Sequence, residues 1–329
     1  MSISSQNNIL EVTDLRKWFP VRTGFFSIMG EKKYVRAVDK VSFSLRDGGS
    51  LCIVGESGCG KTTLARTILR LVEPTEGTIY FQGKNVCDMN REQMRELRLR
   101  MQLIFQNPFE VLDPRLQVRR LVGEGLSIHG LVEDEQDLER RVLQALEDVR
   151  LIPAEDFARR YTHELSGGQL QRVCIARSLI LKPELIIADE PVSMLDASIR
   201  TEVMNLMEDL KNRHRLTYIF ITHDLAQARY IGDEIIVMYL GRIAEMGPME
   251  EVIHNPAHPY TKALVSNVPI PDPDAERHRI LLPGETPTPI DLPEGCRFKP
   301  RCQEFGFGCQ DEEPELREIS PGHYVACWR

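Results

Sequence analysis

The sequence predicts an α/β fold built around a mainly parallel sheet. The apolar segment Leu51–Val54 runs into a glycine-rich turn, and a stretch with apolar residues at helical spacing, GKTTLARTILRL, follows it. Downstream, the apolar segments Leu185–Asp189 and Thr217–Thr222 flank a predicted helix over Ser198–His214. Strands that alternate with helices form parallel sheets joined by crossover helices, so these observations favour an α/β core.

Shorter elements complete this core. Four more apolar segments are predicted strands: Ile9–Val12, Val41–Leu45, Thr78–Phe81 and Leu103–Phe105. A loop with Gly24 and Gly30 separates the first two, and residues 91–100 and 167–180 are predicted helices. From about 116 to 163 charges dominate and strand signals vanish, which predicts an all-helical insertion. Ile235–Leu240 and Arg242–Glu245, hinged at Gly241, are predicted to form a terminal hairpin.

The composition changes after about residue 253. Prolines become dense, and four of the eight cysteines fall in this part of the chain. We therefore expect a main domain over 1–252, with the helical insertion inside it, and a separate loop-rich extension over 253–329.

Charge and hydropathy exclude several classes of protein. The net charge is −8, whereas a dedicated nucleic-acid binder is usually basic, so no nucleic-acid partner is expected. No apolar run approaches the roughly 18 residues that span a bilayer, and the first residues do not resemble a signal peptide. We expect a cytosolic chain with its cysteines reduced.

The segment Gly55–Thr62, GESGCGKT, fits the pattern of a phosphate-binding loop. Its glycines let the backbone curl so that N–H groups point at phosphate oxygens, and the helix that begins near Gly60 adds its positive dipole end. Lys61 is expected to reach the β- and γ-phosphates, and the Thr62 hydroxyl to bind Mg²⁺. The position of the match, after a predicted strand and before a predicted helix, predicts an ATP site.

Two carboxylates follow the predicted strand that ends at Asp189. Ligands of open α/β sheets collect at the carboxyl ends of strands, so Asp189 is expected to hold Mg²⁺, and Glu190 to act as general base on the attacking water or to orient it. His223 follows another strand and is a candidate sensor of the γ-phosphate.

A second predicted phosphate-binding helix end lies at Leu165–Gln169, LSGGQ. Ser166 is expected to cap a helix, while Gly167 and Gly168 leave N–H groups open at its N-terminus. One nucleotide does not need two such ends from one chain, so we expect this one to complete the site of another chain.

The order of these motifs resembles that of an ABC-type ATPase over about residues 10–250. This resemblance implies a P-loop NTPase fold with a RecA-like core, an N-terminal antiparallel β subdomain and a helical subdomain. It also implies a head-to-tail dimer that traps ATP between the P-loop of one chain and the LSGGQ of the other. Gln106 resembles the Q-loop residue that touches Mg²⁺, Ser193–Asp196 the D-loop, and His223 the switch histidine.

The resemblance assigns a full set of residues to the site. Catalytic roles fall to Lys61, Glu190 and His223. Nucleotide contacts are assigned to Phe19, Gly55, Ser57, Gly58, Cys59, Gly60, Lys61, Thr62, Thr63, Gln106, Ser166, Gly168, Gln169 and Asp189. Mg²⁺ is assigned to Thr62, Gln106 and Asp189. Phe19 is the first choice for stacking on adenine, and Tyr34 is the alternative.

The end of the chain narrows the resemblance. HNPAHPYTKAL, LPGETPTP, GCRFKPRC and GHYVACW resemble the C-terminal extension of ATPases that serve oligopeptide and dipeptide importers. ADEPVS and the long N-terminal loop resemble the F-type member of the paired ATPases of such importers. The implied partners are a second, different ATPase, two transmembrane permease subunits and, indirectly, an extracytoplasmic solute-binding protein. The implied location is the cytoplasmic face of the inner membrane. The alternative is a soluble ABC ATPase in DNA repair or translation.

The cysteines of the extension form a candidate metal site. Cys296, Cys302, Cys309 and Cys327 can bind a [4Fe–4S] cluster or a zinc ion, pair as disulfides, or stay free. Resemblance to importer ATPases that carry an iron–sulfur cluster favours the cluster. Of the other cysteines, Cys59 lies inside the predicted P-loop, where its oxidation is expected to block nucleotide binding.

Overall fold

A computed structural model describes residues 8–21, 33–268, 279–290, 292–306, 308–309 and 311–329. The chain forms two compact units. The first comprises Met1–Asp88 and Ile221–Arg329, and the second comprises Met89–Phe220. The loop predicted around Gly24 and Gly30 lies outside the described residues.

One sheet of the first unit is fully antiparallel. It consists of β1 (Asn8–Pro20), β2 (Tyr34–Arg46), β4 (Glu76–Phe81) and β5 (Lys84–Asn85), in the order β2-β1-β4-β5. The strands β1 and β2 are longer than their apolar patterns predict. Several register shifts interrupt their pairing, as between Val12 and Leu15, and each shift breaks the alternation that marks a strand in the sequence.

A second set of strands in the first unit carries the P-loop. β3 (Ser50–Val54) pairs in parallel with β9 (Glu234–Tyr239), and β10 (Arg242–Pro248) pairs antiparallel with β9. The strands β9 and β10 thus form the predicted hairpin, but it does not end the sheet. β12 (His323–Val325) pairs with β10, and β11 (Arg317–Ser320) pairs with β12, so the extension continues the sheet.

A buried side-chain hydrogen bond joins β12 to β10. Glu245 on β10 is fully buried, and the Nε2 of His323 on β12 lies 2.7 Å from its Oε1. The same carboxylate accepts hydrogen bonds from the backbone N–H groups of Ala257 and His258. A buried carboxylate is stable only when its oxygens have such partners, so this one residue joins three segments.

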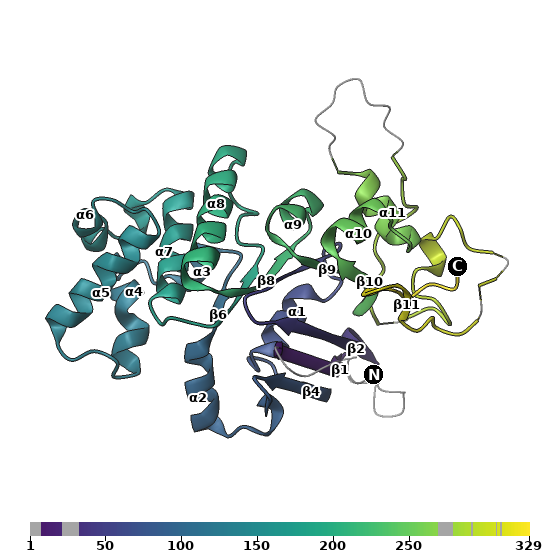
Figure 1. Cartoon of the computed structure of the whole chain (residues 1–329), viewed down its shortest axis with the longest axis horizontal. Helices are drawn as coiled ribbons and strands as arrows, with labels where there is room; N and C mark the ends of the chain where they lie inside the picture. Colours follow the sequence, from purple (N-terminus) through teal and green to yellow (C-terminus); the bar gives the residue numbers. More distant parts are fainter. Residues whose placement is uncertain (1–7, 22–32, 269–278, 291, 307, 310) are drawn as a thin grey trace. The chain divides into compact units, whose positions relative to one another are not determined.

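The helices of the first unit are short. They are α1 (Lys61–Ile68), α9 (Leu225–Ile231), α10 (Met249–His254) and α11 (Pro259–Ser266), with 3-10 turns at Val86–Asp88 and Lys299–Arg301. The helix α11 and the second turn belong to the extension, and α10 crosses its predicted boundary, so the extension is less loop-rich than its proline content predicts. Figure 1 shows α10 and α11 beside the yellow C-terminal strands.

The second unit contains the other strands and the longest helices. β6 (Met101–Ile104) and β7 (Leu185–Asp189) pair in parallel, and β8 (Thr217–Thr222) lies next to β7 and ends in the first unit. The helices here are α2 (Arg91–Arg100), α3 (Pro108–Val111), α7 (Gly167–Leu179) and α8 (Ala197–His214). Each strand predicted for this unit is present, within one or two residues.

The stretch predicted to be all-helical contains α4 (Val118–Ile128), α5 (Glu135–Asp148), α6 (Ala154–Arg159) and a 3-10 turn at Thr162–Glu164. The helices α4 and α5 pack against α7, and α6 packs against α4 and α5 (Figure 1). α4 and α5 bury apolar residues on one face, including Leu121, Val142 and Leu146. The only strand-like contact in the described part of this stretch is an isolated bridge between Gln117 and Tyr161.

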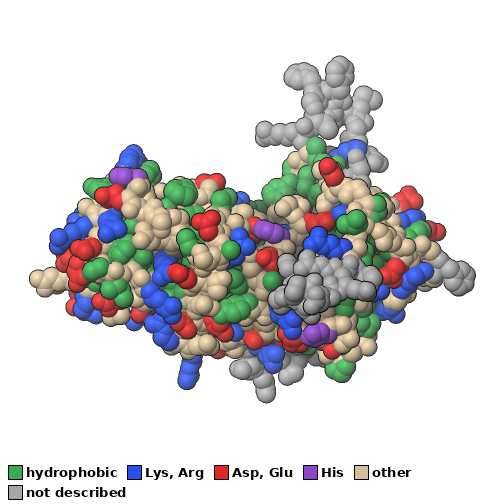
Figure 2. Space-filling model, turned by 90° about the horizontal axis from the view of Figure 1, so that it is seen from above, with side chains coloured by type: hydrophobic (Ala, Val, Ile, Leu, Met, Phe, Trp, Pro, Cys, Tyr) green, Lys and Arg blue, Asp and Glu red, His purple; other side chains and the backbone are tan. Residues whose placement is uncertain are grey.

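Acidic and basic side chains are interspersed on the face shown in Figure 2. That distribution agrees with the acidic net charge and gives no broad basic surface on this face. Among the described residues, no helix is both long and apolar enough to cross a bilayer.

Candidate functional site

The P-loop has the backbone geometry that its sequence predicts. β3 is buried throughout, and the chain then turns through Gly55–Gly60 into α1. Gly60 has φ 108°, and a Cβ there would lie 1.9 Å from the carbonyl oxygen of Ala37. A Cβ on Gly55 would lie 2.3 Å from the oxygen of Met238. Only glycine fits at both positions. The apex of the loop, at Ser57 and Gly58, is exposed to solvent.

Lys61 is held inside this loop. Its side chain is 5% exposed, and its Nζ donates to the carbonyl oxygens of Gly55 and Glu56 at 2.7 and 3.0 Å. Gly60, the residue before α1, makes no side-chain cap, so the first N–H groups of the helix have no cap from a side chain. A cation and a helix N-terminus thus meet at one loop, which suits a polyphosphate. Thr62 and Thr63 follow on the first turn of α1, both half-buried.

Asp189 and Glu190 end β7 in the second unit. Asp189 is 6% exposed, and Glu190 is half-buried with φ 46°, a left-handed conformation that non-glycine residues rarely adopt. Gln106, after β6, donates from Nε2 to Oε2 of Glu190 at 3.1 Å. The prediction that Gln106 belongs to this site therefore agrees with a direct contact to the predicted general base. The hydroxyl and carboxylate oxygens of Thr62 and Asp189 are ligands that Mg²⁺ prefers.

Ser166 caps α7, as the sequence predicts. Its Oγ accepts from the N–H of Gln169 at 3.3 Å, while the Gln169 side chain accepts from the N–H of Ser166 at 3.0 Å. Gly168 has a second role that the sequence did not reveal. A Cβ at Gly168 would lie 2.4 Å from Cγ2 of Ile199 on α8, so the glycine also permits close packing of α7 on α8.

His223 and part of the D-loop are exposed. His223 lies at the surface directly after β8, in the first unit, and Asp224 next to it caps α9. In the D-loop, Met194 is 65% exposed, whereas Leu195 is buried.

Comparison with known proteins identifies the family. Residues 38–193 match the family described as ABC transporter. The chain is 47% identical, over 99% of both chains, to the oligopeptide transport ATP-binding protein AppF of Bacillus subtilis. The chain belongs to the ABC transporter ATP-binding family. The predicted resemblance is confirmed, and this ABC cassette is an ATPase.

Two further likenesses agree with this assignment. Residues 244–309 of the cassette match the family described as oligopeptide/dipeptide transporter, C-terminal region. The cassette is 42% identical to the dipeptide transport ATP-binding protein DppF of Haemophilus influenzae, over 99% of this chain and 98% of that protein. The dimeric ATP-binding cassette MJ0796 with ADP and Pi gives a TM-score of 0.64 at 28% identity, over 73% of this chain and 98% of that chain. These likenesses confirm the predicted fold class and do not favour the alternative of a DNA-repair or translation ATPase.

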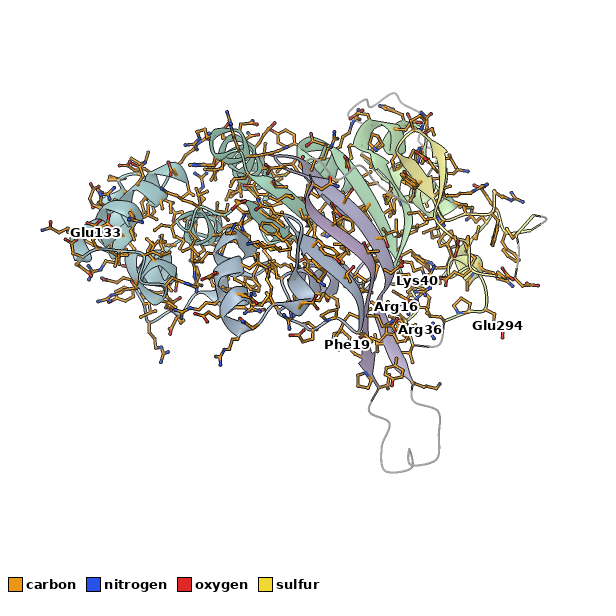
Figure 3. The ribbon with its side chains drawn as sticks, turned by 60° about the horizontal axis from the view of Figure 1, so that its bottom comes forward. Arg16, Phe19, Arg36, Lys40, Glu133 and Glu294 are labelled. Atoms are coloured by element: carbon orange, nitrogen blue, oxygen red, sulfur yellow. The ribbon has the colours of Figure 1, made fainter. Side chains whose placement is uncertain are left out.

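The candidate adenine-stacking residues of the cassette lie at the end of the β1–β2 pair. Phe19 is 37% exposed and carries the Nζ of Lys17 over its ring at 4.9 Å. Tyr34 packs on Trp18, with ring centroids 6.2 Å apart. Figure 3 shows Phe19 with Arg16 and Arg36 at this end of the two strands. The exposed ring of Phe19 is the more available of the two for stacking.

The four cysteines of the extension are free thiols, each half-buried. Burial raises the pKa of the Cys296 and Cys302 thiols, and the neighbouring Cys327 raises both further. Cys309 also raises the pKa of Cys302, so each of the four lies near at least one of the others. Among the described residues, however, no three His, Cys, Asp or Glu side chains are gathered as a ligand set. As placed, the thiols do not form a metal site, and the predicted [4Fe–4S] cluster is not supported.

Cys59 is fully buried within the P-loop. Burial raises its thiol pKa, although the charge of Lys61 lowers it in part. A buried thiol with a raised pKa is a poor nucleophile, so the position of Cys59 opposes the predicted sensitivity to oxidation.

No sequence pattern indicated which residues of the extension contact the P-loop. Tyr260, Thr286 and Arg301 all hydrogen-bond to Glu56, the second residue of the loop. They lie more than 200 positions away from it in the chain. The resemblance of GCRFKPRC to the importer extension was the only signal at Arg301, and it carried no role for that residue.

Proposed function

We propose that this chain is the ATP-hydrolysing subunit that energises import of dipeptides, oligopeptides or a related solute. The observation that carries the proposal is the presence, in one chain, of a formed P-loop and of the C-terminal region found in oligopeptide/dipeptide transporters. The names of relatives that match nearly the whole chain support it.

The proposed roles follow the chemistry of each group. Lys61 binds the β- and γ-phosphates together with the open N–H groups of α1, and Phe19 stacks on adenine. Glu190, held by Gln106, orients the attacking water or takes its proton, and His223 hydrogen-bonds to the γ-phosphate. Mg²⁺, bound by Thr62, Asp189 and Gln106, would neutralise charge that develops on the phosphates.

The proposed assembly contains two ATPase chains head to tail, with transmembrane permease subunits. Ser166, Gly168 and Gln169 of one chain contact ATP on the P-loop of the other. We propose that the second ATPase is a different chain, that an extracytoplasmic protein delivers the solute, and that the assembly lies at the cytoplasmic face of the membrane. The helical segment over about 116–163 of domain 1–252 passes the closing motion to the permease.

A trapped complex tests this proposal. Glu190→Gln should bind Mg-ATP but lose at least about a hundredfold in phosphate release, because the attacking water loses its base. Purified in mild detergent with ATP, the tagged E190Q chain should bring down a second ATPase and integral membrane proteins. Glu208→Gln, on α8, is the matched control and should hydrolyse ATP normally. Recovery of only soluble or ribosomal partners would overturn the transport assignment.

A [4Fe–4S] cluster, or zinc, on Cys296, Cys302, Cys309 and Cys327 stays a prediction. The mutual influence of the thiols supports it, and the lack of an assembled ligand set in the described chain opposes it. Iron, sulfide and zinc are measured in the anaerobically purified complex. About four iron and four sulfide per chain would establish the cluster, and protein without metal would refute it.

A further inference from the structure

The P-loop carries an acidic residue at a place that must bind an anion. Glu56 directly follows Gly55, and its backbone oxygen accepts from Nζ of Lys61. A free carboxylate here would repel the polyphosphate and compete with it for Lys61. The loop therefore needs a partner that neutralises Glu56 without blocking the phosphate site.

Arg301 of the extension is that partner. Its Nη1 and Nη2 donate to Oε2 and Oε1 of Glu56 at 2.6 and 3.1 Å, which is a two-point contact between two planar groups. The Arg301 side chain is 7% exposed, and its Nε donates to the carbonyl oxygen of Pro283. The hydroxyl of Thr286 donates to the same carboxylate.

The electrostatics agree with this geometry. Burial by itself raises the pKa of Glu56, but the bonds from Arg301 and Thr286 and the charges of Arg301 and Lys61 outweigh it, so the pKa is lowered. The carboxylate therefore stays ionised. Arg301 and Lys61 both interact favourably with the charge of the Glu56 carboxylate. When Arg301 is removed, Lys61 is the one of these two cations that still balances Glu56.

The backbone of the loop is held from the extension as well. The N–H of Glu56 donates to the hydroxyl of Tyr260 on α11 at 2.9 Å. Phe298, three residues before Arg301, is 2% exposed and packs against Tyr260 and Tyr239 with ring centroids 5.5 and 5.2 Å apart. The segment that carries Arg301 is thus anchored in the core of the first unit.

A second arginine of the same segment supports the other half of the loop. Arg297 is 5% exposed, forms an ion pair with Asp39, and donates to the carbonyl oxygen of Leu240 at 2.6 Å. The next residue, Gly241, donates its N–H to the carbonyl oxygen of Cys59 at 2.8 Å. The segment between Cys296 and Cys302 therefore supports both halves of the P-loop. It contacts Glu56 directly through Arg301, and it supports Cys59 through Leu240 and Gly241.

We propose that Arg301 is a positioning residue for nucleotide binding: it neutralises and orients Glu56, so that the P-loop and Lys61 are free to accept the polyphosphate of ATP. The extension then completes the ATP site of its own chain. This inference rests on the proposed ATPase site, since it concerns the same P-loop.

Charge rescue tests the proposal. The Kd of Mg-ATP is measured by calorimetry in full-length chains that all carry E190Q, so that ATP persists. Arg301→Ala should weaken binding about tenfold or more, because a carboxylate without its cation faces the phosphates. Glu56→Gln should stay within about threefold of the parent, and E56Q/R301A should return to about that value. Lys299→Ala is the matched control, because it removes a cation of the same segment. The Nζ of Lys299 lies over the Phe305 ring, so the Kd of Mg-ATP should not change.

Each outcome decides something different. Equal affinity of R301A and the parent would overturn the proposal, and so would a double variant as weak as R301A, because that result indicates a structural role without charge balance. Failure of the parent itself to bind Mg-ATP would instead overturn the proposed function. If R301A does not fold, as judged by circular dichroism, Arg301→Gln keeps most of the side-chain volume and is tested in the same cycle.

Discussion

Two helices of this chain begin where phosphate is expected, and they begin differently. The helix α1 follows Gly60, which is left-handed and gives no side-chain cap, and Lys61 lies over the loop before it. The helix α7 follows Ser166, and a reciprocal pair of hydrogen bonds between Ser166 and Gln169 closes its first turn. One N-terminus is held open by glycine, and the other is closed by its own side chains.

The difference shows how each end is prepared for its ligand. The open end of α1 is ready to bind phosphate within one chain, at the cost of backbone conformations that only glycine adopts readily. The closed end of α7 is capped within a single chain. In the proposed dimer, its polar groups exchange these partners for the nucleotide of the other chain. A third helix, α11, sharpens the comparison, because its cap is the titratable residue His258.

The largest effect is expected at the open end. Gly60→Ala should cost about 3 kcal/mol or more in unfolding free energy and abolish ATP binding, because the new Cβ overlaps the Ala37 carbonyl. Gly58→Ala is the matched control. Gly58 also has a positive φ but has open space around it, so the cost should be about 1 kcal/mol. Urea denaturation measures both, and equal costs would contradict the role assigned to the close approach.

The next effect is a pH dependence at α11. His258 is buried, and burial lowers its pKa to about 3, with a further contribution from the charge of Lys262. Its Nδ1 accepts from the N–H of Tyr260 at 3.0 Å. An unfolded histidine takes up a proton below about pH 6.5, whereas the folded one stays neutral. The contribution of neutral His258 to the unfolding free energy is therefore complete above about pH 6.5. Below that pH it falls by about 1.4 kcal/mol per pH unit, until the pH reaches the folded pKa.

His258→Asn keeps a capping side chain and removes the titration. Between pH 7 and pH 5 the parent chain should lose about 2 kcal/mol more stability than H258N, measured by urea denaturation at each pH. His254→Asn, at an exposed position on α10, should retain the parent's slope. A parallel fall in H258N and the parent would exclude His258 as the cause.

The smallest effect separates the two roles of the closed end. Ser166→Ala should lower the unfolding free energy by about 1 kcal/mol through loss of the cap. Ser166→Asp keeps the cap, so stability should stay within about 0.5 kcal/mol of the parent. Its charge should nevertheless lower ATPase activity of the assembled complex about tenfold, because it would face the phosphates of the other chain. Normal activity of S166D in the complex would contradict contact between Ser166 and nucleotide.

Local patterns in the sequence predicted the parts of the molecule that local physics determines. Gly55 and Gly60 mark a tight loop, Ser166 and Gln169 are spaced for a capping box, and Leu185–Asp189 is apolar enough for a buried strand. Each of these features depends on residues within about one helical turn of one another. Most strands of the ATPase domain were predicted for the same reason, whereas the short elements β5, α3 and α9 were not.

Features made by distant residues could not be predicted in this way. β12 is three residues long and is defined by its pairing with β10 and β11 and by the buried contact of His323 with Glu245. The carboxylate of Glu56 looks like a solvated loop residue in the sequence, because nothing near it identifies Arg301. Glycine patterns likewise gave no indication that Ile199 packs on Gly168.

The separation of Glu56 and Arg301 has a consequence for synthesis. A ribosome completes Glu56 245 residues before it reaches Arg301. Through that interval the nascent P-loop contains an acidic side chain without its arginine, whatever the rest of the chain has already folded. The P-loop of this ATPase is thus assembled in two stages, and the second stage waits until the segment that carries Arg301 has been synthesised.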